Sequence, residues 1–160
     1  MTAHAIVREP HDGEWREIAD LLRVCFADEG PEIGGIAPTA ELVEEFQRSG
    51  DHLLVAEVRK RIVGFVRLAV SGRARASQLA VDPKCRRMGY GKRLMEEVEA
   101  EAKTLGREEL RLAVMGTKES LVAYYERLGY TRTGERGKME TVPGYSGPKH
   151  EVTILSKKLR

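Results

Sequence analysis

The residues best suited to chemistry lie between positions 86 and 94, in the stretch RRMGYGKRL. Two glycines and several cationic side chains stand here, immediately before a helical pattern. Glycine lets the backbone approach a ligand closely, and the first N–H groups of a helix have no partners within the helix. The same helix end carries the positive pole of the macrodipole. The stretch therefore predicts an anion site, and a phosphate group is the anion that it fits.

The stretch matches neither of two common nucleotide-binding motifs. A P-loop requires G-x-x-x-x-G-K-[ST], and the first and last of these positions are Arg86 and Arg93. A dinucleotide fingerprint requires a third glycine, where Leu94 stands. What remains is R-x-x-G-x-G, from Arg86 to Gly91, directly after a strand-like run that ends in LAVDP.

This motif is similar to the acetyl-CoA signature, Q/R-x-x-G-x-G/A, of the GCN5-related N-acetyltransferase (GNAT) superfamily. A second stretch, AYYERLGY at 123–130, resembles another signature of that family, an aromatic–tyrosine pair followed by glycine and an aromatic residue. The resemblance runs from near residue 3 to the C-terminus. It implies one acetyltransferase domain over residues 1–160, which transfers an acetyl group from acetyl-CoA to a primary amine.

Acetyl-CoA is thus the expected co-substrate, with no metal. Its phosphates need convergent donors, which backbone N–H groups and bidentate arginines supply. Its pantetheine arm is a chain of amides that can pair with a strand edge as an extra strand does. The expected cofactor contacts are Arg86, Arg87, Met88, Gly89, Tyr90, Gly91 and Lys92 for the phosphates, and Leu79, Ala80 and Val81 for the arm.

Acetyl transfer needs a polarised thioester carbonyl and a proton for the departing thiolate. A backbone N–H near Leu79, on the strand before the signature, can polarise the carbonyl oxygen. A phenol near the sulfur can act as general acid. The resemblance assigns that role to Tyr125, the second tyrosine of the pair, and we expect Tyr124 to pack in the core.

Two positions depart from the pattern that the resemblance implies. Lys118 stands where many members carry an asparagine that holds the pantetheine, and lysine donates hydrogen bonds but accepts none. Many members also have a glutamate on the strand before the signature, whereas RARASQLAV at 73–81 contains no carboxylate. The general base stays open, with solvent alone or six side chains as alternatives: Asp28, Glu29, Glu32, Glu140, His150 and Glu151.

The acceptor amine is expected between two loops, DEGPEIGG at 28–35 and ETVPGYSGPKH at 140–150. The acidic first loop favours a cationic small molecule, such as a polyamine, an aminoglycoside or an amino-acid derivative. A protein N-terminus or a lysine is the alternative acceptor. The alternative function is a non-catalytic acyl-CoA-binding or sensor domain on the same fold, since fold does not fix function.

The elements that must position these residues follow from hydrophobic periodicity. Helical patterns cover 14–26, 40–49, 90–105 and 120–130, with Thr39 as N-cap of the second. Strand patterns cover 3–9, 52–58, 62–70, 73–81, 109–115, part of 131–148 and 150–159, while 28–38 has the composition of a loop. The order β-α-α-β-β-β-α-β-α-β-β predicts an α/β fold with a single mixed, mostly antiparallel sheet and helices on both faces.

Composition and charge exclude other classes of protein. The chain has 160 residues, which suits one core, and a net charge of +2, which favours neither nucleic acid nor a membrane as the partner. No apolar run approaches the roughly 20 residues that span a bilayer. The four histidines, and the two cysteines Cys25 and Cys85, have neither metal-ligand spacing nor a disulfide pattern. We expect a cytoplasmic monomer or homodimer.

Overall fold

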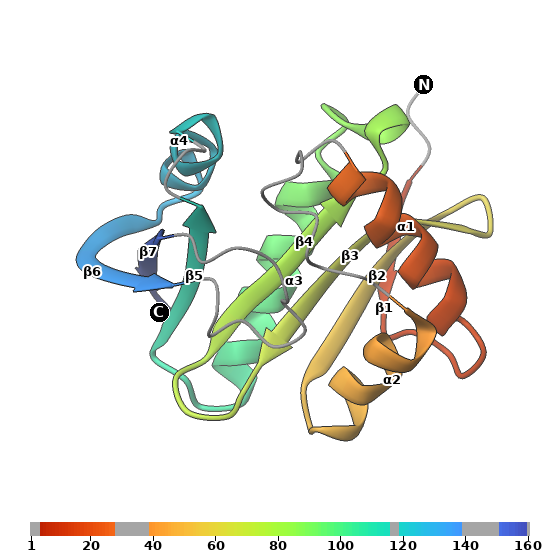
Figure 1. Cartoon of the computed structure of the whole chain (residues 1–160), viewed down its shortest axis with the longest axis horizontal. Coiled ribbons are helices and arrows are strands. Elements are labelled where there is room, and N and C mark those ends of the chain that lie inside the picture. Colours follow the sequence, from red (N-terminus) through yellow and green to blue (C-terminus); the bar gives the residue numbers. More distant parts are fainter. Residues whose placement is uncertain (1–3, 28–38, 116–118, 139–150, 160) are drawn as a thin grey trace.

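The strands among the described residues form one seven-stranded sheet in the order β1-β2-β3-β4-β5-β7-β6. This computed structural model describes residues 4–27, 39–115, 119–138 and 151–159, with helices on both faces of the sheet (Figure 1). The strands are β1 (Ile6–Arg8), β2 (His52–Val58), β3 (Arg61–Ala69), β4 (Arg75–Val81), β5 (Glu109–Met115), β6 (Thr131–Lys138) and β7 (Glu151–Lys158). The helices are α1 (Trp15–Ala27), α2 (Ala40–Arg48), α3 (Tyr90–Thr104) and α4 (Glu119–Arg127), with a short 3₁₀ turn at Pro83–Cys85.

The element order and the mixed sheet confirm the fold predicted from the sequence. Every neighbouring pair of strands is antiparallel except β4 and β5, which run parallel. The boundaries differ from the expected ones by a few residues at most described ends, and β2 begins and ends where predicted. The expected loop at 28–38 and the Pro/Gly segment before β7 lie outside the described residues.

β4 and β5 diverge soon after they meet. Their one register pair among the described residues joins Arg75 to Arg111, and the two strands then separate toward their C-terminal ends (Figure 1). From Ser77 to Val81, the β5-facing edge of β4 therefore has backbone groups with no ladder partner. An extended ligand can pair with such an edge.

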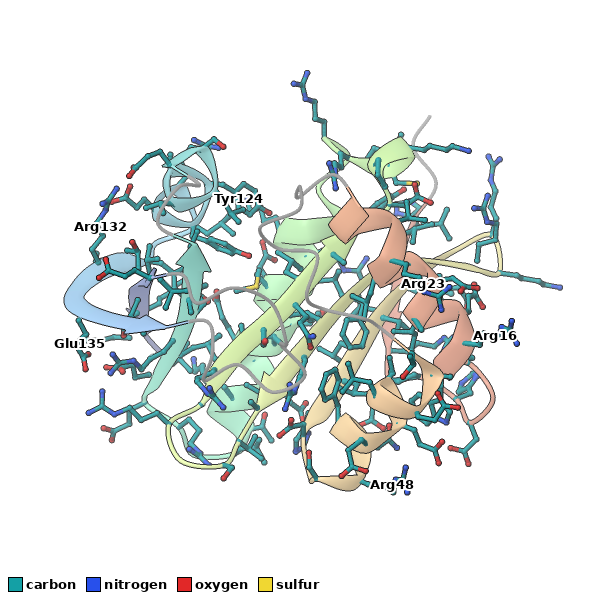
Figure 2. All side chains as sticks on the ribbon, in the orientation of Figure 1. Arg16, Arg23, Arg48, Tyr124, Arg132 and Glu135 are labelled. Atoms are coloured by element: carbon teal, nitrogen blue, oxygen red, sulfur yellow. The ribbon has the colours of Figure 1, made fainter. Side chains whose placement is uncertain are left out.

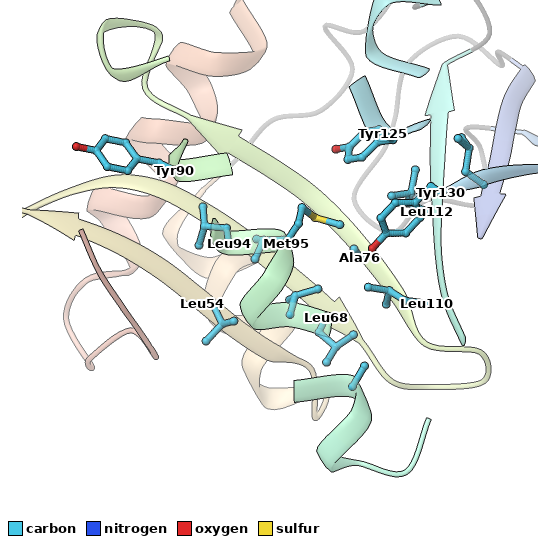
Figure 3. Packing of buried hydrophobic residues seen from close by; sticks show 14 of the residues in the cluster. Leu54, Leu68, Ala76, Tyr90, Leu94, Met95, Leu110, Leu112, Tyr125 and Tyr130 are labelled. Carbon is cyan, nitrogen blue, oxygen red and sulfur yellow. The ribbon is translucent and has the colours of Figure 1, made fainter. Parts of the chain in front are cut away.

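Two core clusters flank the sheet because the side chains of a strand alternate between its faces. On one face α1 and α2 pack against Phe65 of β3, through Ile18 and Phe46 among others. On the other face α3 packs against Val66 and Leu68, and α4 contributes to the same cluster (Figure 3). Helices thus cover both faces of the sheet, and the sheet is broken where β4 and β5 diverge.

Local signals explain how the elements around that break begin and end. Thr39 caps α2 as predicted, since the Leu42 amide donates to its hydroxyl at 3.1 Å. Asp82 and Pro83 end β4, because proline cannot continue a ladder, and the Asp82 carboxylate accepts from the Lys84 amide at 2.9 Å. This cap turns the chain from β4 toward α3.

Candidate active site

A cavity of about 480 Å³ lies where β4, the turn after it, the start of α3 and α4 come together. Its volume is in the range of small-molecule sites. All but one of the residues predicted to contact the cofactor line this cleft: Leu79, Ala80, Val81, Arg86, Arg87, Gly89, Tyr90, Gly91 and Lys92. The exception is Met88, whose side chain is 49% exposed on the turn and does not line the cleft. Tyr125 lies in the lining as well.

The turn between β4 and α3 is shaped to present N–H groups. Arg87 and Gly89 both have left-handed backbone conformations, with φ of 66° and 83°. α3 begins at Tyr90, and its N-cap residue, Gly89, makes no side-chain capping hydrogen bond. The first turn of α3 carries no acidic residue. A turn of this kind offers an anion the backbone N–H groups of a helix start, the positive end of the helix dipole and nearby cationic side chains.

The two tyrosines of α4 reach the cleft in different ways. Tyr125 is only 8% exposed, and its hydroxyl points toward β4 (Figure 3). Its ring makes edge contacts with Tyr124 and Tyr130, at centroid distances of 5.3 and 6.1 Å. Burial raises the pKa of Tyr125, so its phenol stays protonated at neutral pH and is a hydrogen-bond donor.

Tyr124, predicted to be a core residue, packs against the core cluster but is only half-buried (Figure 2). Its hydroxyl lies 2.9 Å from the position that a Cβ on Gly91 would take. Gly91 thus lets the Tyr124 phenol contact the start of α3 across the cleft. Burial raises the pKa of Tyr124 as well.

Sequence reasoning missed polar groups of the cleft, among them the thiol of Cys25 on α1. Its Sγ donates to the Val81 carbonyl at 3.3 Å, and the Arg86 Nε donates to the same oxygen at 3.3 Å. Burial raises the pKa of the Cys25 thiol, so the thiol form persists at neutral pH. The helical periodicity of α1 predicted a buried Cys25 but not its partner. Cys85 also lines the cleft, and both cysteines are free.

Comparison with known families agrees with this geometry. The family model described as an acetyltransferase (GNAT) domain matches residues 27–145. The chain belongs to the GNAT family. The family is that of N-acetyltransferase enzymes, and the resemblance implied by the two sequence signatures is confirmed.

The individual GNAT proteins that this chain resembles are distant from it in sequence. The mycothiol acetyltransferase of Amycolatopsis mediterranei is 36% identical over 104 residues, and the match covers 57% of this chain and 33% of that protein. The chain thus spans about a third of the length of this curated relative. An aminoglycoside 6'-N-acetyltransferase complexed with coenzyme A has a TM-score of 0.73 and 20% identity, over 97% of both chains. A GNAT acetyltransferase of Elizabethkingia anophelis with acetyl-CoA bound has a TM-score of 0.74 and 19% identity, over 97% of this chain and 98% of that one. At these identities the two structures establish a shared fold.

Several residues expected to matter in a GNAT site lie outside the described residues. They are Lys118 and five candidate bases: Asp28, Glu29, Glu32, Glu140 and His150. The sixth candidate base, Glu151, is exposed at the start of β7. Arg93, a neighbour of the cationic turn, donates to the Ala5 carbonyl at 2.7 Å and so attaches α3 to the N-terminal segment.

The described part of the GNAT chain has neither a cluster of metal-ligating side chains nor a helix fit to cross a bilayer. Its His, Cys, Asp and Glu side chains form no group of three or more with the arrangement of metal ligands. None of its helices combines the length and the apolarity that a bilayer crossing requires.

Proposed function

We propose that this chain transfers the acetyl group of acetyl-CoA to a primary amine by direct attack of the amine on the thioester, as one domain over residues 1–160. The observation that carries the proposal is the meeting of three features in one cleft. These are the N–H-rich turn at 87–92, the unpaired edge of β4 and the buried phenol of Tyr125. Each serves a different part of acetyl-CoA.

The phosphates of the cofactor bind at the turn, with Arg86, Arg87 and Lys92 adding charge. The pantetheine arm extends along Leu79–Val81, where β5 no longer pairs with β4. This direction brings the thioester toward the Leu79 N–H and the Tyr125 phenol. Family neighbours that hold coenzyme A or acetyl-CoA on the same fold support this assignment.

In the reaction the neutral amine nitrogen attacks the carbonyl carbon, whose oxygen gains charge and is stabilised by the Leu79 N–H. The C–S bond then breaks, and the sulfur leaves with the electron pair. The Tyr125 phenol protonates the sulfur, and solvent or one of the candidate bases takes the proton that the amine loses. A reactive thioester needs mainly positioning and modest electrostatic help.

The acceptor we propose is the amine of a small molecule rather than of a protein. The names of two relatives, an aminoglycoside acetyltransferase and a mycothiol acetyltransferase, support this class. The alternative is a non-catalytic acyl-CoA-binding or sensor domain, favoured by the absence of a carboxylate on β4. A monomer or homodimer suffices for either function, since one chain lines the cleft.

Ligand-induced stabilisation and thiol release together test the proposed function. Coenzyme A at a hundredfold excess over its Kd should stabilise the native state by about 2.7 kcal/mol, which for a domain of this size raises Tm by about 5–10 °C. Thiol release from acetyl-CoA should then depend on an added amine. Four kinds of probe are compared: a polyamine, an aminoglycoside, a peptide with a free N-terminal alanine, and an N-terminally blocked lysine peptide. A Tm shift without thiol release from any probe favours the sensor, and no Tm shift contradicts both functions.

Cationic side chains at the turn should contribute to affinity for the nucleotide part of coenzyme A. We expect Arg86→Ala and Lys92→Ala each to raise the Kd of coenzyme A about tenfold, because a hydrogen bond to a charged group contributes about 1.5–3 kcal/mol. Binding of a pantetheine fragment without the nucleotide should change little. Calorimetry of both ligands measures the difference, with Lys103→Ala in the last turn of α3 as the control. Equal losses for both ligands would mean that Arg86 and Lys92 act on folding.

A further inference from the structure

Two turns of the chain hold cationic side chains on a strained backbone. The turn between β2 and β3 places Arg59 and Lys60 at φ of 50° and 65°, and the turn after β4 places Arg87 at φ of 66°. Among the described residues, only Gln78, at a β-bulge of β4, shares this left-handed conformation without being glycine. Long side chains rarely adopt it. Strain of this kind clusters at functional sites, which makes the three cations candidates for a function.

The two turns are neighbours in space. Val58 pairs with Arg61 across the two-residue loop of the β2–β3 hairpin. The Arg61 guanidinium lies 4.0 Å from the Asp82 carboxylate, where the second turn begins. Both turns project from the same upper-right end of the molecule in Figure 1. Together they form an exposed surface, the cationic end, made of Arg59, Lys60, Arg61, Lys84, Arg86 and Arg87.

The acidic side chains near the cationic end already have partners. The Asp82 carboxylate is the ion-pair partner of Arg61, and Glu57 pairs with Arg8 at 2.8 Å. The Glu17 carboxylate accepts from a backbone amide of β3 at 2.9 Å. Within the described residues, Arg61 is the only member of the cationic end that forms an ion pair. Most of the charge at this end is therefore not neutralised by the described part of the chain.

The cofactor cleft leaves most of the cationic end unused. Arg86 and Arg87 line the cleft, but Lys84 and the β2–β3 turn do not. Exposed apolar side chains accompany the unused charges. Met88 is 49% exposed next to Arg87, and Ile6, which begins β1 beside the end of β2, is 57% exposed.

Cationic side chains with exposed aliphatic groups among them match the surface of a bilayer that contains anionic lipids. The cations attract the headgroups, and the aliphatic side chains enter the interface between headgroups and acyl chains. Single-stranded nucleic acid, another common polyanion, is usually held by stacking on aromatic rings. Tyr90 is the aromatic residue nearest to these turns in the sequence, and it is only 7% exposed.

We propose that the cationic end docks on a bilayer surface rich in anionic lipids, with the β2–β3 turn on the headgroups and Met88 in the interface. This inference goes beyond the proposed function, in which Arg59 and Lys60 take no part. The net charge of +2 did not indicate a membrane partner, because it averages this end with a more acidic remainder of the chain.

The test measures co-sedimentation of the full chain with vesicles of phosphatidylcholine and about 30% phosphatidylserine, compared with vesicles of phosphatidylcholine alone. We expect binding to the anionic vesicles only, and weaker binding as salt rises, because the contacts join exposed charges. Arg59→Asn with Lys60→Gly installs the residue pair that a left-handed two-residue turn prefers. This double variant should bind the anionic vesicles about twentyfold less tightly, at about fivefold for each cation. Its Tm should rise as strain is relieved, and its Kd for coenzyme A should stay within twofold of the wild-type value.

Two further variants separate the kinds of contact. Met88→Asn should lower vesicle affinity about fivefold and leave its salt dependence unchanged, because an apolar contact is not screened. Arg48→Asn with Arg132→Asn removes the same charge from exposed positions away from both turns (Figure 2). This charge-matched control should keep vesicle affinity within twofold of the wild-type value.

The proposal fails if the wild-type protein does not prefer anionic vesicles, or if the charge-matched control loses as much affinity as the turn variant. It also fails if the turn variant or Met88→Asn keeps wild-type affinity for the vesicles. A fall in Tm together with the loss of binding would assign Arg59 and Lys60 to the fold. Binding of a single-stranded RNA, lost in the turn variant and without any vesicle binding, would assign the cationic end to nucleic acid. The proposed function survives each of these results, since coenzyme A binding and thiol release test it separately.

Discussion

Gly89→Val should raise the Kd of coenzyme A by at least about a hundredfold and abolish the ligand-induced rise in Tm. Gly89 has a φ of 83°, and a Cβ built there meets no atom within 4 Å, so the free protein has space for a side chain. The loss comes instead from the backbone, because a β-branched residue avoids the left-handed region. The strain of about 1–3 kcal/mol would move the N–H groups at the start of α3 away from the phosphates. Each lost hydrogen bond to a charged ligand adds about 1.5–3 kcal/mol.

Gly72→Val is the matched control for this experiment. Gly72 has a φ of 74°, equally open space around it, and a place in the turn between β3 and β4, outside the cleft. The control should lower Tm through the same backbone strain and keep the full rise in Tm with coenzyme A. Gly89→Ala should fall between the wild type and Gly89→Val. Wild-type coenzyme A affinity in Gly89→Val contradicts the assignment of the turn to phosphate.

The turn at 87–92 was predictable because its determinants are local. Gly89 and Gly91 belong to the six-residue motif from Arg86 to Gly91. The residues next to them in sequence are also next to them in space. The proline that ends β4 and the apolar stripe of α3 lie within the same stretch. The alternation of β2 and β3 is likewise a property of single segments. These patterns therefore specified the fold and most of the residues that line the cleft without knowledge of any long-range contact.

Features that depend on contacts between segments far apart in the chain could not be predicted from the sequence. The Cys25 thiol meets the Val81 carbonyl across 56 positions of the chain. Arg67, in a run that predicts an apolar strand, forms a buried ion pair with Asp51 at 2.6 Å and stacks on Phe46 at 3.9 Å. The bulge at Gln78 follows from the pairing of β4 with β3, which no single-strand pattern encodes. The sequence around such residues does not distinguish them from their neighbours, because their particular contacts arise only in the folded chain.

The tyrosine pair shows the same limit inside one helix. Consecutive residues of a helix point about 100° apart, so periodicity allows only one of Tyr124 and Tyr125 to face the core fully. Periodicity alone did not say which, and the resemblance to the family pattern chose Tyr125 for the sulfur. In the fold Tyr125 is the more buried of the two, although both line the cleft. The choice between their hydroxyls is therefore a question for kinetics.

Tyr125→Phe should lower kcat at least about tenfold while leaving KM and the Kd of coenzyme A unchanged. General acid catalysis typically contributes 10²–10⁴-fold, and water partly replaces a missing phenol. The loss belongs in kcat, because the phenol interacts with a sulfur that becomes anionic only as the C–S bond breaks. The fold should survive, since phenylalanine keeps the edge contacts of the ring with Tyr124 and Tyr130. Burial raises the pKa of Tyr125 above its ordinary value of 10.0, so the wild-type pH profile should show no fall from phenol ionisation below that pH.

Two other Tyr→Phe variants decide whether the effect is specific to this hydroxyl. The Tyr130 hydroxyl donates to Glu99 at 2.8 Å and does not line the cleft, so Tyr130→Phe should lower Tm and leave kcat unchanged. Tyr124→Phe removes the hydroxyl that contacts the start of α3 and tests the rival assignment. If Tyr124→Phe carries the loss of kcat and Tyr125→Phe does not, the acid is Tyr124 and the buried ring of Tyr125 serves packing. If neither variant loses activity, the sulfur takes its proton from water or from the cationic nitrogen that forms once the neutral amine has attacked.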